Sequence, residues 1–124
     1  MTRATLLFAH GARDPRWAEP FAAVATRIRA ADPGHRVELA FLELMRPDLR
    51  EAAAALAGAG ATRIDVVPLF LGSGGHVRRD LPALLATLRD AHRDVDFRLH
   101  GAVGESDAVI EAMARTALDA SRSE

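Results

Sequence analysis

The chain has 124 residues, 49% hydrophobic and 27% charged, which is enough for one domain with a hydrophobic core and too little for two. Its 16 basic residues, all of them Arg, stand against 17 acidic ones, and this near-neutral balance without a long basic run argues against nucleic-acid binding. Cys and Lys are absent, which excludes disulfides, thiolate metal sites, thiol nucleophiles, Schiff bases and a phosphate-loop lysine.

The N-terminus carries no signal-peptide pattern, and no apolar run reaches the roughly 18 residues of a membrane span. We therefore expect a soluble cytoplasmic protein that binds neither nucleic acid nor membrane.

Four apolar runs alternate with amphipathic segments along the chain. The runs, which are typical of buried parallel strands, are Thr5–Ala9, Val37–Leu42, Ile64–Leu71 and Phe97–Leu99. Helices are predicted to begin near Asp14, Pro47, Asp80 and Ser106. Pro68 lacks a donor for the ladder, which indicates that the third strand lies at an edge or carries a bulge.

Four strand–helix units of this size predict an α/β fold. Such units build a parallel sheet with right-handed crossovers and helices on both faces. We expect a flavodoxin-like, four-stranded sheet in the order 2-1-3-4, forming a single domain over residues 1–124 in which 121–124 are a frayed tail.

An ionisable residue stands at or just after each predicted strand. These residues, His10, Glu43, His76 and His100, are expected to meet at the carboxyl edge of the sheet, where ligands of parallel folds bind. Because strands one and three are neighbours in the predicted order, His10 and His76 could share one ion. Two imidazoles and a carboxylate suit divalent cobalt, iron or nickel, and a neutral imidazole can also accept a proton.

The alternative for each histidine is a structural one. A His before Gly at a strand end can simply cap a turn, and this interpretation is favoured for His100. His35 and His92 are expected to be solvated surface residues.

A glycine-rich loop and several arginines are placed on the same rim. The loop Leu71-Gly72-Ser73-Gly74-Gly75-His76 allows close approach of the backbone to a ligand and can form an anion-binding nest, although a flexible turn is the alternative. The arginines, Arg13, Arg46, Arg78 and Arg79, suit an acidic ligand because guanidinium groups pair with carboxylates. They could instead pair with the aspartates near them in sequence, Asp14, Asp48 and Asp80.

Three ordered blocks of sequence resemble a known family. They are His10-Gly11-Ala12-Arg13-Asp14-Pro15, then Phe41-Leu42-Glu43 with Pro47, then Pro68-Leu69-Phe70-Leu71 through Gly75-His76-Val77 to Asp80-Leu81-Pro82. Together they resemble the short form of the sirohydrochlorin cobaltochelatases and ferrochelatases, over the first two thirds of the chain. The resemblance implies a chelatase-like fold and insertion of Co²⁺, Fe²⁺ or Ni²⁺ into sirohydrochlorin, a polycarboxylate tetrapyrrole, in cobalamin or sirohaem biosynthesis.

The resemblance also implies roles for individual residues. His10 would be the proton acceptor and a metal ligand, His76 a second metal ligand, and Glu43 a group near the metal. Arg46 and the segment from Leu71 to His76 would contact the tetrapyrrole. The divalent metal would be a substrate, and no tightly bound cofactor is expected.

The size of the chain adds an expectation about assembly. A flat macrocycle needs walls on two faces, and longer relatives in this group have two tandem lobes, so a chain of 124 residues supplies one wall. We expect a homodimer with facing rims; a monomer with an open groove is the opposing hypothesis.

Two other functions compete with the chelatase. A non-catalytic carrier of metal or tetrapyrrole would use the same rim without turnover. A histidine phosphatase, suggested by His10-Gly11, would need an Arg immediately before the nucleophilic His, and position 9 is Ala. The residues do not distinguish among cobalt, iron and nickel, because all three accept the same ligands.

Overall fold

The protein folds around a four-stranded parallel sheet. The computed structural model describes residues 2–72 and 74–123, so Ser73 of the predicted loop lies outside the described residues. The strands are β1 (Arg3–Ala9), β2 (Arg36–Phe41), β3 (Arg63–Pro68) and β4 (Asp96–Leu99). Their order is β2-β1-β3-β4 and every pairing is parallel, which confirms the predicted flavodoxin-like arrangement.

Helices follow each strand, as the amphipathic segments predict. They are the 3₁₀ helix η1 (Pro15–Ala18), α1 (Glu19–Ala31), α2 (Leu49–Gly58), α3 (Gly75–Ala91), the 3₁₀ helix η2 (Val103–Glu105) and α4 (Asp107–Arg122). Within the part of the chain that the structure describes, no helix combines the length and apolarity that a membrane crossing requires.

Two helix starts show how local chemistry defines the ends of these elements. The Asp14 carboxylate accepts from the backbone N–H of Arg16 and so caps η1, and α1 begins only after that turn. Asp48 and Glu51 form a reciprocal capping box at the start of α2, with Asp48 accepting from the Glu51 N–H at 2.8 Å.

The predicted end of the third strand is wrong. The strand ends at Pro68 rather than Leu71. It is a central strand, as the predicted order 2-1-3-4 requires, and the edge position suggested by Pro68 is excluded. The missing N–H of Pro68 would point toward β4, but β4 ends at Leu99, before it reaches Pro68. The last bond between the two strands runs from the N–H of His100, the residue after β4, to the Val66 carbonyl, so Pro68 removes no bond from the ladder.

The third helix begins at Gly75, five residues before the predicted Asp80 (80 − 75). Gly75 and His76 therefore belong to its first turn. The apolar residues Leu81, Leu85 and Leu88 are all buried, and their packing stabilises a helix that reaches back to Gly75.

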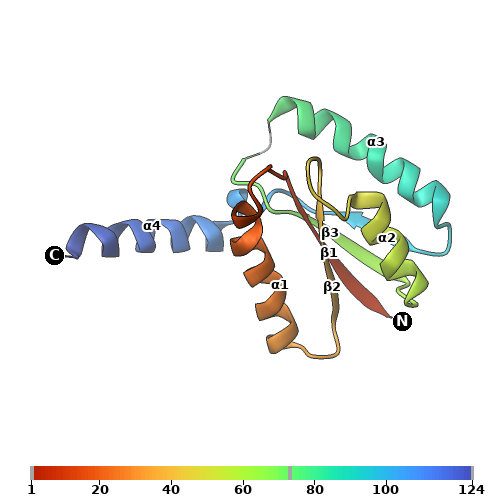
Figure 1. Ribbon diagram of the computed structural model, residues 1–124, viewed down its shortest axis with the longest axis horizontal. Helices are drawn as coiled ribbons and strands as arrows, with labels where there is room; N and C mark the ends of the chain where they lie inside the picture. The colour runs from red at the N-terminus through yellow and green to blue at the C-terminus, as the bar shows by residue number, and fades with distance from the viewer. Residues whose placement is uncertain (1, 73, 124) are drawn as a thin grey trace.

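The two faces of the sheet are covered unequally. Helices α2 and α3 lie on one face and α1 on the other (Figure 1). The larger core, on the α2 and α3 side, includes Phe8, Ile64, Val66, Leu85 and Phe97. The smaller one consists of Leu7, Ala25 and Val37, with four partly buried neighbours.

Helix α4 forms where the sequence predicts a helix, but it does not pack on the sheet. All of its residues are described, and none is buried. Figure 1 shows it extending away from the rest of the chain.

Candidate functional site

His10 and Glu43 lie next to each other at the carboxyl edge of the sheet. They follow β1 and β2, and the ladder between these strands continues past their ends, with Leu42 N–H donating to the Ala9 carbonyl and Glu43 N–H donating to the His10 carbonyl at 3.1 Å. The side chains are 51% and 55% exposed, and Nδ1 of His10 lies 3.7 Å from Oε1 of Glu43. At this distance the two groups form no direct hydrogen bond, so each retains capacity for a ligand or a proton.

Gly11 allows this approach. Its φ is +98°, in the region that favours glycine. A Cβ atom at this position would clash with the backbone carbonyl of Glu43. The His10-Gly11 dipeptide is therefore required by the packing of the two loops, and it holds the imidazole beside the carboxylate.

The glycine-rich segment reaches the same edge, after β3. Leu69 N–H donates to the Phe8 carbonyl at 2.8 Å, which joins the start of the segment to β1. Gly104 of η2 supports it from the other side: its N–H donates to the Phe70 carbonyl at 2.9 Å, and a Cβ atom there would clash with the backbone of Leu71. The backbone of His76 lies in the first turn of α3; the side chains of His76 and Arg78 lie outside what the structure describes.

Arg46 has an acidic partner, although not the one predicted. Its guanidinium forms a forked pair with Glu51, at 3.1 Å to Oε1 and 2.7 Å to Oε2. Hydrogen bonding to Glu51 raises the pKa of Arg46 and, from the other side, lowers the pKa of the Glu51 carboxyl. Asp48 is not the partner because its carboxylate caps α2. Exposed pairs of this kind contribute little to stability, so a ligand carboxylate can displace Glu51.

The alternative in which Arg13 pairs with Asp14 is also wrong. Asp14 is occupied by Arg16, which donates to it from its backbone and its guanidinium, and these bonds lower the pKa of the Asp14 carboxyl. Arg13 is exposed and makes no ion pair within residues 2–72 and 74–123. It remains available to a ligand.

Two leucines at this edge are exposed, and the sequence pattern points to only one of them. Leu71 opens the predicted loop, whereas Leu44 lies directly after Glu43, outside the predicted site residues. Leu44 adopts a φ of +65°, which is unfavourable for a side chain with a Cβ atom. The sequence carries no signal that a leucine adopts this conformation. The position of Leu44 next to Glu43 is the one feature that indicates a place at the site.

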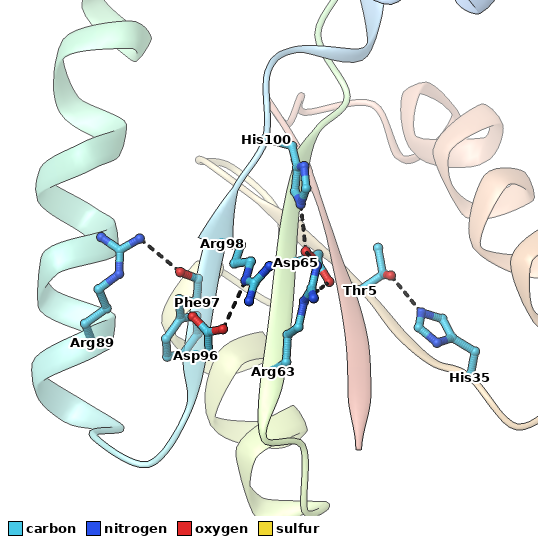
Figure 2. A network of polar contacts seen from close by, with 9 residues as sticks. All are labelled: Thr5, His35, Arg63, Asp65, Arg89, Asp96, Phe97, Arg98 and His100. Carbon is cyan, nitrogen blue, oxygen red and sulfur yellow. Dashed lines mark hydrogen bonds and ion pairs between the residues drawn. The ribbon is translucent and has the colours of Figure 1, made fainter. Parts of the chain in front are cut away.

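His100 does not join the rim. Its Nε2 lies 2.7 Å from Oδ1 of Asp65, and Arg63 forms a forked pair with the same carboxylate at 3.1 Å. Figure 2 shows His100 turned back along the face of the sheet toward Asp65. Burial raises the pKa of Asp65, but the hydrogen bonds from Arg63 and His100 outweigh it and hold that pKa below its ordinary value. The prediction that His100 meets the other three ionisable residues at the carboxyl edge is therefore wrong.

The two remaining histidines are not simple surface residues. His35 is half-buried, and its Nε2 lies 2.7 Å from the hydroxyl of Thr5 (Figure 2). His92 is half-buried as well, with its ring centroid 6.1 Å from that of Phe97. Both have structural partners, and neither lies at the carboxyl edge.

An open apolar pocket of about 380 Å³ adjoins the rim between α3 and β4. Its lining includes Phe70, Val77, Leu81, Leu99 and His100. Among the described side chains, no group of three or more His, Asp or Glu converges in a way that could hold a metal ion. The described part of the site is therefore a histidine–carboxylate pair with open surroundings, a set that suits transient rather than permanent binding of an ion.

The sheet order and the position of this pair define a class of protein. The chain is a flavodoxin-like parallel α/β protein whose candidate site lies at the carboxyl edge beside the strand at which the order reverses. The sequence profile of the family described as CbiX matches residues 4–120, and the chain belongs to that family.

Curated relatives agree with this assignment. The chain is 31% identical over 116 residues to a sirohydrochlorin cobaltochelatase of Saccharolobus solfataricus, covering 89% of each chain. It is 37% identical over 81 residues to the one of Methanosarcina acetivorans, covering 65% of this chain and 62% of that one. The match thus spans less than two thirds of the latter protein and of several other archaeal relatives.

Solved structures extend the match to the fold. A crystal structure of a CbiX protein from Marinobacter aquaeolei, described as a putative cobalamin biosynthesis protein, superposes with a TM-score of 0.83 at 31% identity, over 98% of this chain and 99% of that one. The sirohydrochlorin chelatase SirB from Bacillus subtilis subspecies spizizenii, in complex with cobalt, gives a TM-score of 0.82 at 28% identity. That match covers 96% of this chain and 51% of SirB.

Proposed function

We propose that the protein inserts a divalent metal ion, Co²⁺ in the first place, into sirohydrochlorin. The observation that carries this proposal is the open pair of His10 and Glu43, held together at the carboxyl edge of a CbiX-family fold. The names of the relatives, sirohydrochlorin cobaltochelatase and sirohydrochlorin chelatase, support the substrate and the reaction. The product would serve cobalamin biosynthesis or, with iron, sirohaem biosynthesis.

The chemistry requires a base beside a weakly held ion. As the ion enters the ring, two pyrrole N–H bonds break and the ring nitrogens bind the metal, so two protons must leave. His10 and the Glu43 carboxylate can accept one proton each. Both side chains are more than half exposed, so they can pass these protons to water and return to their starting state.

The metal is a substrate in this scheme rather than a resident cofactor. Nδ1 of His10 is the ring nitrogen near Glu43, which leaves Nε2 for the ion or for a pyrrole proton. His76, at the start of α3, is proposed as the second ligand. Two ligands hold an ion less tightly than a closed four-ligand site does, which favours its transfer to the ring.

The surroundings of the pair fit a flat ring that bears carboxylates. The exposed side chains of Leu44 and Leu71 offer apolar surface to the ring. Arg13, Arg46 and Arg78 are proposed to bind its carboxylates.

The segment Leu71, Gly72, Ser73, Gly74, Gly75 and His76 is proposed to contact the ring as well. Helix α3 begins with Gly74 as its N-cap, which has no side chain to accept from the first N–H groups. A carboxylate of the ligand can take this place.

We also propose that the protein works as a homodimer with facing rims, in the cytoplasm. A planar macrocycle has two faces, and one rim of this chain can cover only one of them. The SirB match leaves about half of that longer protein without a counterpart in this chain, and a second copy would supply the equivalent surface.

The proposal is tested by a multiple-turnover assay that follows the visible absorbance of sirohydrochlorin in excess over protein, with Co²⁺, Fe²⁺ and Ni²⁺ in turn. A chelatase converts many equivalents of sirohydrochlorin and accelerates the reaction above the rate of metal and tetrapyrrole alone. A non-catalytic carrier would bind one equivalent per site and stop. That second result, with all three metals, would overturn the proposal.

A further inference from the structure

Leu44 has a backbone conformation that few residues other than glycine adopt. Its φ is +65°, and in this left-handed region the Cβ atom of an ordinary residue crowds the backbone carbonyl oxygen. Among the described residues, the other positive φ angles belong to Gly11 and Gly60. Leu44 is therefore the one described side chain that the fold holds at this conformational cost.

The loop that contains Leu44 is fixed at both ends. Glu43 N–H donates to the His10 carbonyl at 3.1 Å, and Phe41 N–H donates to the Pro47 carbonyl at 2.9 Å. The chain thus returns to the end of β2 within a few residues. A glycine at position 44 would supply the left-handed turn without the steric cost.

Packing within the chain does not account for a leucine at this position. The Leu44 side chain is 59% exposed and belongs to neither hydrophobic core. Strained backbone of this kind clusters at active sites and ligand clamps, where the strain serves the function. The use of this side chain therefore lies outside the packing of the single chain.

Leu44 has a counterpart on the other side of His10. Strand β1, which ends just before His10, lies between β2 and β3 in the sheet, so the loops that carry Leu44 and Leu71 flank the histidine. These two leucines are 59% and 71% exposed, more than any other large apolar side chain in the part of the chain that the structure describes. Two such side chains beside one polar pair indicate a surface for an apolar ligand.

The polar groups of the rim do not by themselves select a ring. Arg13 and Arg46 suit carboxylates, and a small acyclic polycarboxylate presents the same groups as a tetrapyrrole does. The feature that distinguishes the tetrapyrrole is its flat apolar body. Leu44 and Leu71 are placed to contact such a body beside the histidine.

We propose that Leu44 determines the specificity for the ring by packing its side chain on the flat face of the tetrapyrrole. The left-handed backbone is retained because it presents this side chain next to Glu43. The inference rests on the proposed function for the identity of the ring. Because specificity is a difference of affinities, Leu44 should strengthen binding of the ring without strengthening binding of its carboxylates.

The first test compares sirohydrochlorin with citrate, an acyclic polycarboxylate, by calorimetric titration of the protein without metal. Leu44→Ala removes the apolar contact, so the Kd for sirohydrochlorin is expected to rise by about tenfold. The Kd for citrate is expected to change by less than about twofold, because the arginines remain.

Two further variants serve as controls in the same titration. Leu44→Met keeps a flexible apolar side chain and should bind sirohydrochlorin within about threefold of wild type. Val24→Ala alters an exposed apolar residue of α1 and should change neither Kd. Equal weakening toward sirohydrochlorin and citrate in Leu44→Ala would indicate a general loss of the site and would overturn the proposal.

The second test separates the backbone of Leu44 from its side chain. Leu44→Gly and Leu44→Ala both remove the apolar contact and should weaken sirohydrochlorin binding equally. Glycine ordinarily lowers stability relative to alanine, but at a φ of +65° the order is expected to reverse. Leu44→Gly should therefore unfold at a higher urea concentration than Leu44→Ala; the opposite order would contradict the strain.

The insertion assay separates this inference from the proposed function. A wild type that inserts metal, together with a Leu44→Ala variant that binds sirohydrochlorin as wild type does, would overturn the inference alone. Binding without turnover, with the same tenfold loss in Leu44→Ala, would overturn the proposed function and support the inference. A wild type that does not bind sirohydrochlorin would overturn both.

Discussion

Two histidine–carboxylate pairs among the described side chains lie near the carboxyl ends of parallel strands, and they differ in how tightly they are held. At the rim, His10 and Glu43 are 3.7 Å apart and more than half exposed. On the face of the sheet, His100 and Asp65 are 2.7 Å apart, and the Asp65 side chain is only 19% exposed.

The difference separates the pair for which we propose a chemical role from a pair with a structural one. The Asp65 carboxylate already accepts bonds from Arg63 and His100, so it has little capacity left for a ligand. His10 and Glu43 are positioned by their backbones and not by each other, which leaves their side chains free to bind an ion or accept protons. Substitutions that break one pair and leave the other intact can therefore distinguish the two roles.

The largest effect is expected from Gly11→Ala, because it forces the two rim loops apart. The new Cβ atom would clash with the Glu43 carbonyl, and the φ of +98° adds strain. We expect a loss of about 3 kcal/mol or more in the free energy of unfolding, with loss of metal insertion.

Gly60→Ala is the matched control, since the φ of Gly60 is +99° and no atom lies within 4 Å of an added Cβ atom. It should lower the free energy of unfolding by about 1 kcal/mol and leave metal insertion unchanged. Chemical denaturation and the insertion assay measure both; equal effects of the two substitutions would contradict the account.

Glu43→Gln tests the rim pair without changing its shape. It removes a proton acceptor, so we expect the turnover rate to fall by about 10- to 100-fold while the free energy of unfolding stays the same. Asp65→Asn is the matched change in the other pair and should leave the turnover rate within about twofold of wild type. A reversed pattern would assign the chemistry to the sheet face.

Asp65→Asn is expected to act on stability instead. It removes the acceptor that Arg63 and His100 share, which should lower the free energy of unfolding by about 1 to 3 kcal/mol at neutral pH. Because the folded pKa of Asp65 lies below its unfolded value, its contribution is fully present above about pH 4 and is lost as the pH falls through the folded pKa.

Urea denaturation at pH 7 and in acid measures this difference. The gap between wild type and Asp65→Asn should narrow in acid. A gap that stays constant from pH 7 to pH 3 would show that the carboxylate charge does not contribute.

The smallest effect is expected from Arg46→Ala. The ion pair of Arg46 with Glu51 is exposed, so the free energy of unfolding should not change measurably. If Arg46 binds a carboxylate of the substrate, KM should rise by about three- to tenfold with kcat unchanged. Steady-state kinetics against sirohydrochlorin measure this split; a fall in kcat at constant KM would place Arg46 in the chemical step instead.

The sequence predicted the sheet order, the strand–helix alternation and the rim position of His10 and Glu43, because these follow from apolar runs, caps and parallel topology. It misplaced the start of α3, since two glycines suggest a loop, whereas packing of Leu81 and Leu85 extends the helix back to Gly75.

The sequence also did not predict side-chain partners that depend on which donor occupies a carboxylate. Asp48 is unavailable to Arg46 because it caps α2, and His100 turns to Asp65 because that carboxylate lies on the neighbouring strand. The pattern of α4 predicts an apolar stripe, but the folded position of a helix depends on the turn before it, which in this protein is fixed by Gly104.

The most direct test of the central claim compares the two histidines in one assay. His10→Ala and His100→Ala are measured for cobalt insertion into sirohydrochlorin, with circular dichroism and urea denaturation as controls for the fold. We predict that His10→Ala lowers turnover by about 100-fold or more at unchanged stability. His100→Ala should retain turnover and lose about 1 kcal/mol of stability. Full activity in His10→Ala, or a greater loss of activity in His100→Ala than in His10→Ala, would contradict the account.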